Sequence, residues 1–213
     1  MTRVLALVHG GGALPCALGL GEVTALVLGD PDGARGVAAA RAAGVARVVA
    51  IAEDGIVATD YLGAAQVVAS AARKLGFDVI VAGAGHRGAL GPAVAERLSL
   101  LHLTGVVEAR IDDQAVIARR RAGGFVRTYR APLPVVLCAS AALALEAPPA
   151  SPSVETPIER LTLAEIGVAP AELGWRRRFA PQPATGPTPR PRVLPDVPAL
   201  VERLRAERLV GGR

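Results

Sequence analysis

Three glycine-rich loops hold the residues of this sequence that are best suited to chemistry. Each loop follows a short apolar run of the kind that forms a buried parallel strand. Glycines allow a ligand to approach the backbone closely, and helix N-termini after such loops offer unpaired N–H groups to phosphate. Arg87 adds a phosphate partner to the longest loop, which therefore predicts a site for a phosphate-bearing ligand. The loops are His9-Gly10-Gly11-Gly12, Gly29-Asp30 and Gly83-Ala84-Gly85-His86-Arg87-Gly88-Ala89-Leu90-Gly91.

Groups that could carry a covalent reaction are scarce. The histidines His9, His86 and His102 are separated in sequence, and no serine lies in a nucleophile elbow. The sequence has no Walker loop, and no dinucleotide fingerprint follows the first strand. Cys16 and Cys138 lie in apolar surroundings without metal-ligand spacing, so we expect two small buried hydrophobes in a reducing compartment. These features favour a nucleotide-binding or carrier subunit over an enzyme.

The elements that position the loops alternate between apolar strands and helices. We predict buried strands over Val4–Val8, Val23–Leu28, Ala46–Ala52 and Asp78–Ala82. We predict helices from an Asp30 N-cap to Gly44, from an Asp60 N-cap to Gly76, and over Pro92–Leu98. Successive strand–helix units of this kind predict an α/β fold with a doubly wound parallel sheet in three layers.

The hydrophobic period changes after Leu103. Three further strands are predicted, with turns at Asp112-Asp113 and Gly123-Gly124 between them, and they form a small antiparallel extension. A last buried strand follows the prolines at 132 and 134. These four strands are Val106–Ile111, Val116–Arg121, Phe125–Tyr129 and Val135–Cys138.

Proline dominates the C-terminal part of the sequence, with a dense run from Pro181 to Pro198. Such a segment cannot form a core of its own, so it predicts an extended arm. Leu200, Val201 and Leu204 then recur at helical spacing, as in a short amphipathic helix docked on a partner. We therefore expect an α/β nucleotide-binding domain over residues 1–175 and an arm with a terminal helix over residues 176–213.

Composition excludes several classes of protein. With 51% hydrophobic and 20% charged residues among 213, the chain has enough apolar material for one sizeable core. Aromatic residues are only 3%, too few for a platform that stacks single-stranded nucleic acid. The net charge of +5 is not gathered in a stripe, so we expect no nucleic-acid partner. No apolar run reaches about 18 residues, so we expect a cytoplasmic protein without membrane insertion.

The order of these segments resembles the β subunit of electron transfer flavoproteins. The similarity is strongest where Asp78–Gly83 is followed by Gly91–Leu98, a strand and a Gly-Pro helix that a nucleotide-contacting loop joins in that family. The other similar segments are Glu22–Gly29, Ala43–Arg47, Thr59-Asp60, Arg119–Gly124, Pro134–Cys138, Pro157–Glu159 and Glu165–Val168. The proline-rich arm and the terminal helix also have counterparts, so the resemblance spans nearly the whole chain.

The resemblance implies the three-layer fold of the adenine nucleotide α-hydrolase-like class and a non-catalytic electron carrier. Its partner would be an α subunit with which it shares FAD, and the heterodimer would pass electrons from flavin-dependent dehydrogenases to a membrane quinone oxidoreductase. This subunit would itself bind AMP, or a second FAD as in electron-bifurcating members. Carried over by position, largely backbone contacts to the cofactor would come from Leu7, Val8, His9, Leu28, Gly29, Gly83, Arg87, Gly88, Ala89 and Leu90.

Three departures from the family pattern leave alternatives open. The segment between His9 and Glu22 is too short for the family's first helix, and the third loop lacks the acidic and Thr-Gly-Gln residues that hold ribose and phosphate. The loop that docks on dehydrogenases is shortened to Ser151–Thr156, which leaves open a specialised branch that serves a peptide-derived cofactor such as mycofactocin. A free-standing adenine-nucleotide module like a universal stress protein is the main alternative, and a small hydrolase is a third.

Overall fold

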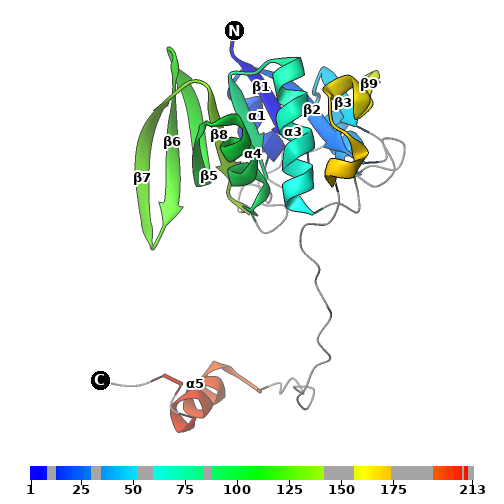
Figure 1. Cartoon of the computed structure of the whole chain (residues 1–213). Helices are drawn as coiled ribbons and strands as arrows, with labels where there is room; N and C mark the ends of the chain where they lie inside the picture. Colours follow the sequence, from blue (N-terminus) through cyan, green and yellow to red (C-terminus); the bar gives the residue numbers. More distant parts are fainter. Residues whose placement is uncertain are drawn as a thin grey trace. The chain divides into compact units, whose positions relative to one another are not determined.

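A computed structural model describes residues 1–8, 13–29, 35–51, 60–83, 88–141, 156–173, 194–207 and 209–210 of the chain. It divides into two compact units, Met1–Arg177 and Arg178–Arg213. The first unit is an α/β domain built on one sheet, and the described residues of the second include one helix, α5 (Figure 1).

Nine strands form the sheet, in the order β7-β6-β5-β8-β4-β1-β2-β3-β9. The pairs from β5·β8 through to β3·β9 are parallel, whereas β5·β6 and β6·β7 are antiparallel. The strands are β1 (Arg3–Leu7), β2 (Glu22–Leu28), β3 (Arg47–Ile51), β4 (Val79–Ala82), β5 (Leu101–Asp112), β6 (Ala115–Ala122), β7 (Phe125–Pro132), β8 (Val135–Ala139) and β9 (Ile158–Leu161). The predicted parallel sheet with an antiparallel extension is confirmed.

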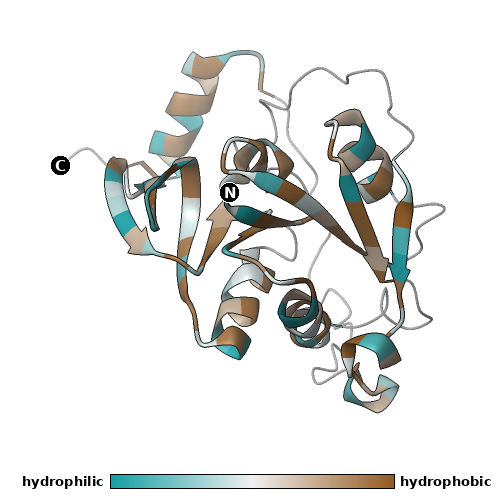
Figure 2. Cartoon of the chain, turned by 90° about the horizontal axis from the view of Figure 1, so that it is seen from above, coloured by the Kyte–Doolittle hydropathy of each residue, from teal (hydrophilic) through white to brown (hydrophobic). Residues whose placement is uncertain are grey.

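Helices cover both faces of the sheet, which makes the predicted three-layer α/β fold (Figure 2). One face packs against α1 (Ala13–Leu18) and α2 (Arg35–Ala42), and the other against α3 (Tyr61–Leu75), α4 (Leu90–Leu98) and the 3₁₀ helices η3 (Ala164–Ile166) and η4 (Pro170–Leu173). Alternate residues of β1 enter the two layers: Val4 and Ala6 face α1, whereas Leu5 and Leu7 face α3 and α4. Burial on both sides explains why the central strands are continuous apolar runs.

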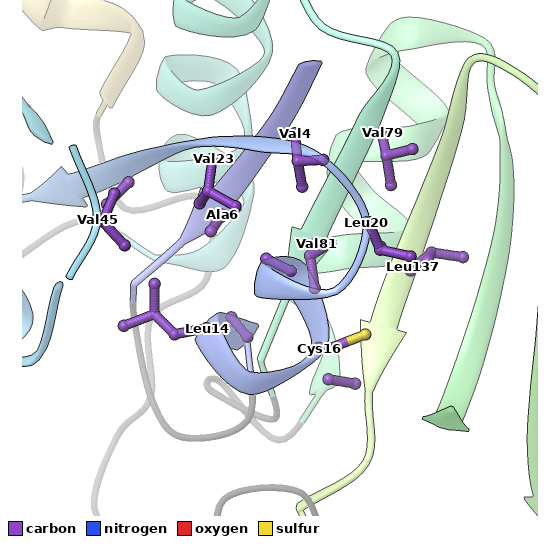
Figure 3. Close-up of a cluster of buried hydrophobic side chains, with 14 of the residues drawn as sticks. Val4, Ala6, Leu14, Cys16, Leu20, Val23, Val45, Val79, Val81 and Leu137 are labelled. Atoms are coloured by element: carbon purple, nitrogen blue, oxygen red, sulfur yellow. The ribbon is translucent and has the colours of Figure 1, made fainter. Parts of the chain in front are cut away.

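A short first helix forms after β1 although the segment is brief. The six residues of α1 place Leu14 and Cys16 in the cluster that also holds Val4 and Ala6 of β1 and Val81 of β4 (Figure 3). Leu20, in the turn that follows the helix, packs on the same cluster. This layer of the core therefore needs only a turn and a half of helix.

The predicted limits of α3 are confirmed. The Asp60 carboxylate accepts hydrogen bonds from the backbone N–H groups of Leu62 (3.0 Å) and Gly63 (2.9 Å), and Gly76 ends the helix with a φ of 73°. Helix α4 begins at Leu90, two residues before the predicted start at Pro92, and ends at Ser99 in a left-handed conformation. The predicted N-cap at Asp30 lies outside the described residues.

Strand β5 is bent. The bend is evident because the two ends of the strand lie near the same point. Leu101 pairs with Val135 of β8, whereas the turn after Asp112 lies beside Leu133, whose N–H donates to the Gln114 carbonyl at 3.1 Å. A straight strand of this length would span about 36 Å. The register shifts at Thr104/Val106 and Val106/Glu108, with Gly105 at a φ of 69°, mark the corner. The bend lays β6 and β7 against the α1 side of the core.

One strand was missed by the sequence prediction, which took Val135–Cys138 as the last. Strand β9 comes later and pairs with β3 at the sheet edge, and Arg47 binds Glu159 across the pair at 2.8 Å. Only Leu161 of β9 is buried, so the strand has no apolar run to identify it. The predicted terminal helix is present in the second unit as α5 (Val197–Ala206), with Asp196 as its N-cap. Most of the proline-rich run lies outside the described residues.

Candidate functional site

The order of the strands places a switch point between β1 and β4. The chain leaves β1 for α1 on one face and leaves β4 for α4 on the opposite face, while β1 and β4 are parallel neighbours. In open α/β sheets the connections diverge at such a point and leave a crevice at the carboxyl ends of the strands, where ligands bind. The predicted loops follow β1, β2 and β4, which are adjacent in the sheet.

The end of β1 contributes backbone. Leu7 lies opposite Leu26 of β2 and Ala82 of β4, and its side chain is buried in the α3–α4 layer. The Val8 N–H donates to the Leu26 carbonyl at 3.0 Å, and the Val8 side chain packs against the α1 layer. The side chains of Leu7 and Val8 at this strand end therefore pack in the core.

The end of β2 is shaped by two glycines. Gly29 follows Leu28 with a φ of 102°, and its N–H donates to the Ile51 carbonyl of β3 at 2.9 Å. Gly36, in the first turn of α2, lies so close to the end of β1 that a Cβ there would be 3.0 Å from the Val8 carbonyl oxygen. The close approach brings the start of α2 to the same edge of the sheet.

The described part of the turn after β4 consists of Gly83, Gly88 and Ala89. Gly83 is buried at the strand end, and Gly88 has a φ of 79° with open space where a Cβ would lie. At the start of α4, the Ala93 N–H donates a hydrogen bond to the Ala89 carbonyl at 3.2 Å. No side chain caps α4 at Ala89, in contrast to the carboxylate that caps α3. A helix start without a side-chain cap is a common site for an anion.

Helix α4 is held tightly against the strands beneath it. A Cβ at Gly91 would overlap the Cys138 sulfur of β8 and lie 3.1 Å from the Ala82 Cβ of β4. Burial raises the pKa of the Cys138 thiol to about 12 and that of Cys16 to about 11. Both thiols are free, buried and protonated at neutral pH, so the predicted role of each as a small hydrophobe is confirmed.

The structure brings most of the predicted contact residues to one edge. Those at the ends of β1, β2 and β4 are Leu7, Val8, Leu28, Gly29, Gly83, Gly88, Ala89 and Leu90. His9 and Arg87 lie outside the described residues, together with Gly10, Gly11, Gly12 and residues 84–86. The sequence prediction missed the uncapped start of α4, although Ala89 in place of Ser, Thr, Asp or Asn is a signal for it. No cluster of three or more metal-ligating side chains occurs among the residues that the structure describes.

The strand order and the helices on both faces define a doubly wound α/β domain, a class whose ligand sites usually lie at the carboxyl edge of the sheet. Residues 5–166 match the family model of the electron transfer flavoprotein domain. The chain belongs to the electron transfer flavoprotein family, whose members in general bind flavin and carry electrons.

Two curated relatives of this chain are proteins named FixA. The FixA protein of Azorhizobium caulinodans is 31% identical over 142 residues, which cover 59% of this chain and 50% of the relative. The FixA protein of Bradyrhizobium diazoefficiens is 30% identical over 142 residues, which cover 59% of this chain and 49% of the relative. The chain thus spans about half the length of the curated relatives it matches. Within the described residues, no helix is both long and apolar enough to cross a membrane.

Proposed function

We propose that this chain is the β-type subunit of a heterodimeric electron transfer flavoprotein and that it holds AMP or FAD in the crevice between β1 and β4. The observation that carries the proposal is the uncapped, glycine-led start of α4 at the switch point of a chain from this family. The described residues fit a phosphate group, because a helix start without a side-chain cap adjoins open space at Gly88. FAD, when bound, supplies the electron-carrying chemistry.

The side chains at the crevice support a binding role for this chain. Leu7 and Leu90 are buried in the core, so their backbone groups are what they offer to a nucleotide. Gly83 and Gly88 let the nucleotide approach the backbone, and Val8 and Leu28 border it. His9 and Arg87, from the same two loops, are proposed as further contacts. The chain's own residues would orient the nucleotide and hold its phosphate.

The second unit is proposed as the contact to an α subunit that shares FAD with this chain. Helix α5 has no buried residue, and its Val197 is 70% exposed. A shallow groove of about 410 Å³ beside it is lined by Leu194, Asp196, Val197 and Leu200. We assign residues 1–175 to nucleotide binding and residues 176–213 to this docking. The complete complex would act in the cytoplasm between flavin-dependent dehydrogenases and a membrane quinone oxidoreductase.

The nucleotide proposal is tested by mass spectrometry of small molecules released from the denatured chain, purified alone and with its α partner. We expect AMP or FAD in wild type and loss of both in Ala89→Asp. An aspartate there adds a negative charge to the first turn of α4, where it repels phosphate while it favours the helix dipole. Ala89→Asn has the same shape without the charge and serves as the matched control.

Two results would contradict the proposed function. Absence of any adenine nucleotide from both wild-type preparations would remove the crevice as a nucleotide site. A stable homodimer that binds ATP without a flavoprotein partner would instead indicate a module like a universal stress protein. Truncation after Ala180 tests the docking role separately, because we expect it to abolish co-purification with the α subunit. An intact, flavin-loaded complex after truncation would show that the arm is dispensable.

A further inference from the structure

Two arginines face each other on the inner side of the antiparallel extension. Along β6, the residues Val116 and Ala118 are buried against the α1 side of the core, and Arg120 follows at the same two-residue spacing. Arg120 lies directly opposite Arg127 of β7 in the strand register. Side chains in such a pair share one face with Cβ atoms about 4.5–5.5 Å apart. Two positive charges are thus held together on the inner face of this sheet.

No carboxylate balances this pair within the described part of the chain. Two arginines of the outer face have acidic partners, since Arg119 binds Glu108 at 2.6 Å and Arg130 lies 3.8 Å from Asp112. The inner face carries no acidic residue among its described members, which are Val106, Ala109, Ile111, Val116, Ala118, Arg120, Phe125, Arg127, Tyr129 and Ala131. Like charges directly opposite each other destabilise a sheet. The arrangement is explained if an anion completes it.

A second observation on Arg120, independent of the strand register, also indicates that a ligand is missing from this site. Its Nε atom is buried, and it has no hydrogen-bond partner among the described residues. A buried donor without a partner costs free energy, and more so in a charged group. An oxyanion that accepted from Nε and from the Arg127 guanidinium would satisfy both groups with charge-assisted hydrogen bonds.

Protection of a sheet edge does not account for the pair. An inward-pointing charge on an edge strand discourages edge-to-edge aggregation, and Arg127 lies on the edge strand β7. Arg120, however, lies on β6, which is paired on both sides and has no edge to protect. A second function is needed for Arg120.

The surroundings indicate what kind of anion fits. Phe125 and Tyr129 lie two residues before and after Arg127, so they share its face of β7. Phe125 is 67% exposed, an unusual position for a large apolar side chain in a chain with few aromatics. Val106, opposite Arg120, pairs with Ala139 at the carboxyl end of β8, so the pair lies toward the same edge as the crevice, with β8 between them.

We propose that Arg120 and Arg127 bind the phosphate of a small molecule at a second site on this chain, with Phe125 and Tyr129 beside it. The shared chemistry is a phosphate group, either free or attached to a planar ring that stacks on the aromatic side chains. The site is separate from the proposed nucleotide crevice and does not depend on it.

The test is calorimetric titration of the full-length chain with pyrophosphate and with flavin mononucleotide. We expect Arg120→Gln and Arg127→Gln each to weaken the binding of both probes by about 10-fold or more, the usual effect of losing a charge-assisted hydrogen bond. Arg121→Gln is the matched control, because it removes the same charge from the next residue on the outer face. We expect it to change affinity less than about twofold.

Further variants distinguish a free phosphate from a ring-bearing ligand, and they test whether the crevice or edge protection explains the results instead. If Phe125→Ala weakens only flavin mononucleotide, the phosphate belongs to a ring-bearing ligand; if it weakens neither probe, the ligand is a free phosphate. Ala89→Asp should leave this binding unchanged, which separates it from the crevice. Pyrophosphate that fails to bind, or that binds equally well to both glutamine variants, would overturn the proposal. So would self-association of Arg127→Gln as the sole effect, which would indicate edge protection.

Discussion

Gly91 of α4 lies directly over the sulfur atom of Cys138 on β8, with no room for a side chain between the helix and the sheet. The contact brings the backbone of the first α4 turn down onto β4 and β8. That turn carries the uncapped N–H groups at the proposed phosphate position. The packing of one glycine thus sets the height of the helix end above the crevice.

Gly91→Ala should destabilise the domain because a methyl group would overlap the Cys138 sulfur. Overpacking of this kind costs about 1–3 kcal/mol. Cys138→Ala removes the sulfur, so the double variant should recover much of the loss caused by Gly91→Ala. Denaturant unfolding of the four proteins in a double-mutant cycle measures this coupling. Additive effects of the two substitutions would contradict the proposed contact.

Asp60 should stabilise α3 through its acceptor oxygen more than through its charge. The carboxylate accepts from the N–H groups of Leu62 and Gly63. We expect Asp60→Ala to cost about 1 kcal/mol of unfolding free energy and Asp60→Asn to cost much less, since asparagine is an equally good N-cap. Urea denaturation curves of the three proteins give the comparison. Equal losses in the two variants would assign the role to the negative charge.

The strands and the cap of α3 could be predicted because local rules and tertiary structure agree there. Burial on both faces makes β1 to β4 and β8 continuous apolar runs, and Asp60 and Gly76 have capping roles that depend on adjacent residues. The edge of the sheet that holds the crevice was also predictable. Parallel strands align their carboxyl ends, so loops far apart in sequence meet at one edge.

The features that escaped prediction depend on contacts distant in sequence. Strand β9 exists because β3 offers it a pairing edge, and its own residues carry no strand pattern. The bend in β5 reverses the strand at Gly105, which alternation of residues along the strand does not reveal. The inward orientation of Arg120 follows from the register of β6 with β5 and β7, which the sequence alone does not determine.

The ion pair between Arg3 and Asp78 should make stability depend on acid pH. The Arg3 side chain and backbone N–H donate to the carboxylate at 2.8–2.9 Å, and these bonds join the starts of β1 and β4. Hydrogen bonds from Arg3 lower the pKa of Asp78 below its usual 3.8. The stabilisation is therefore present above about pH 4 and is lost as pH falls through the lowered value.

Asp78→Asn tests this dependence. At pH 7 we expect the variant to unfold at lower urea concentration than wild type, and the difference should shrink as the pH falls below 3.8. Urea midpoints measured at several pH values check the trend. Glu159→Gln, which alters the exposed Arg47 pair between β3 and the edge strand β9, provides a comparison away from the β1–β4 pair. A wild-type to Asp78→Asn difference that stays constant with pH would contradict the assigned pairing.

The two buried thiols should resist alkylation for as long as the α/β domain stays folded. Burial raises the pKa of Cys16 to about 11 and that of Cys138 to about 12, so almost no thiolate exists at pH 8. Because both thiols are more easily kept protonated in the folded state, they contribute to its stability below the unfolded pKa of about 9. This contribution to folding stability is lost as the pH rises toward the pKa values of the folded state. Iodoacetamide labelling followed by mass spectrometry should modify both residues together, at a rate that rises with denaturant. Rapid labelling of Cys138 alone in native conditions would show that α4 opens independently of the sheet.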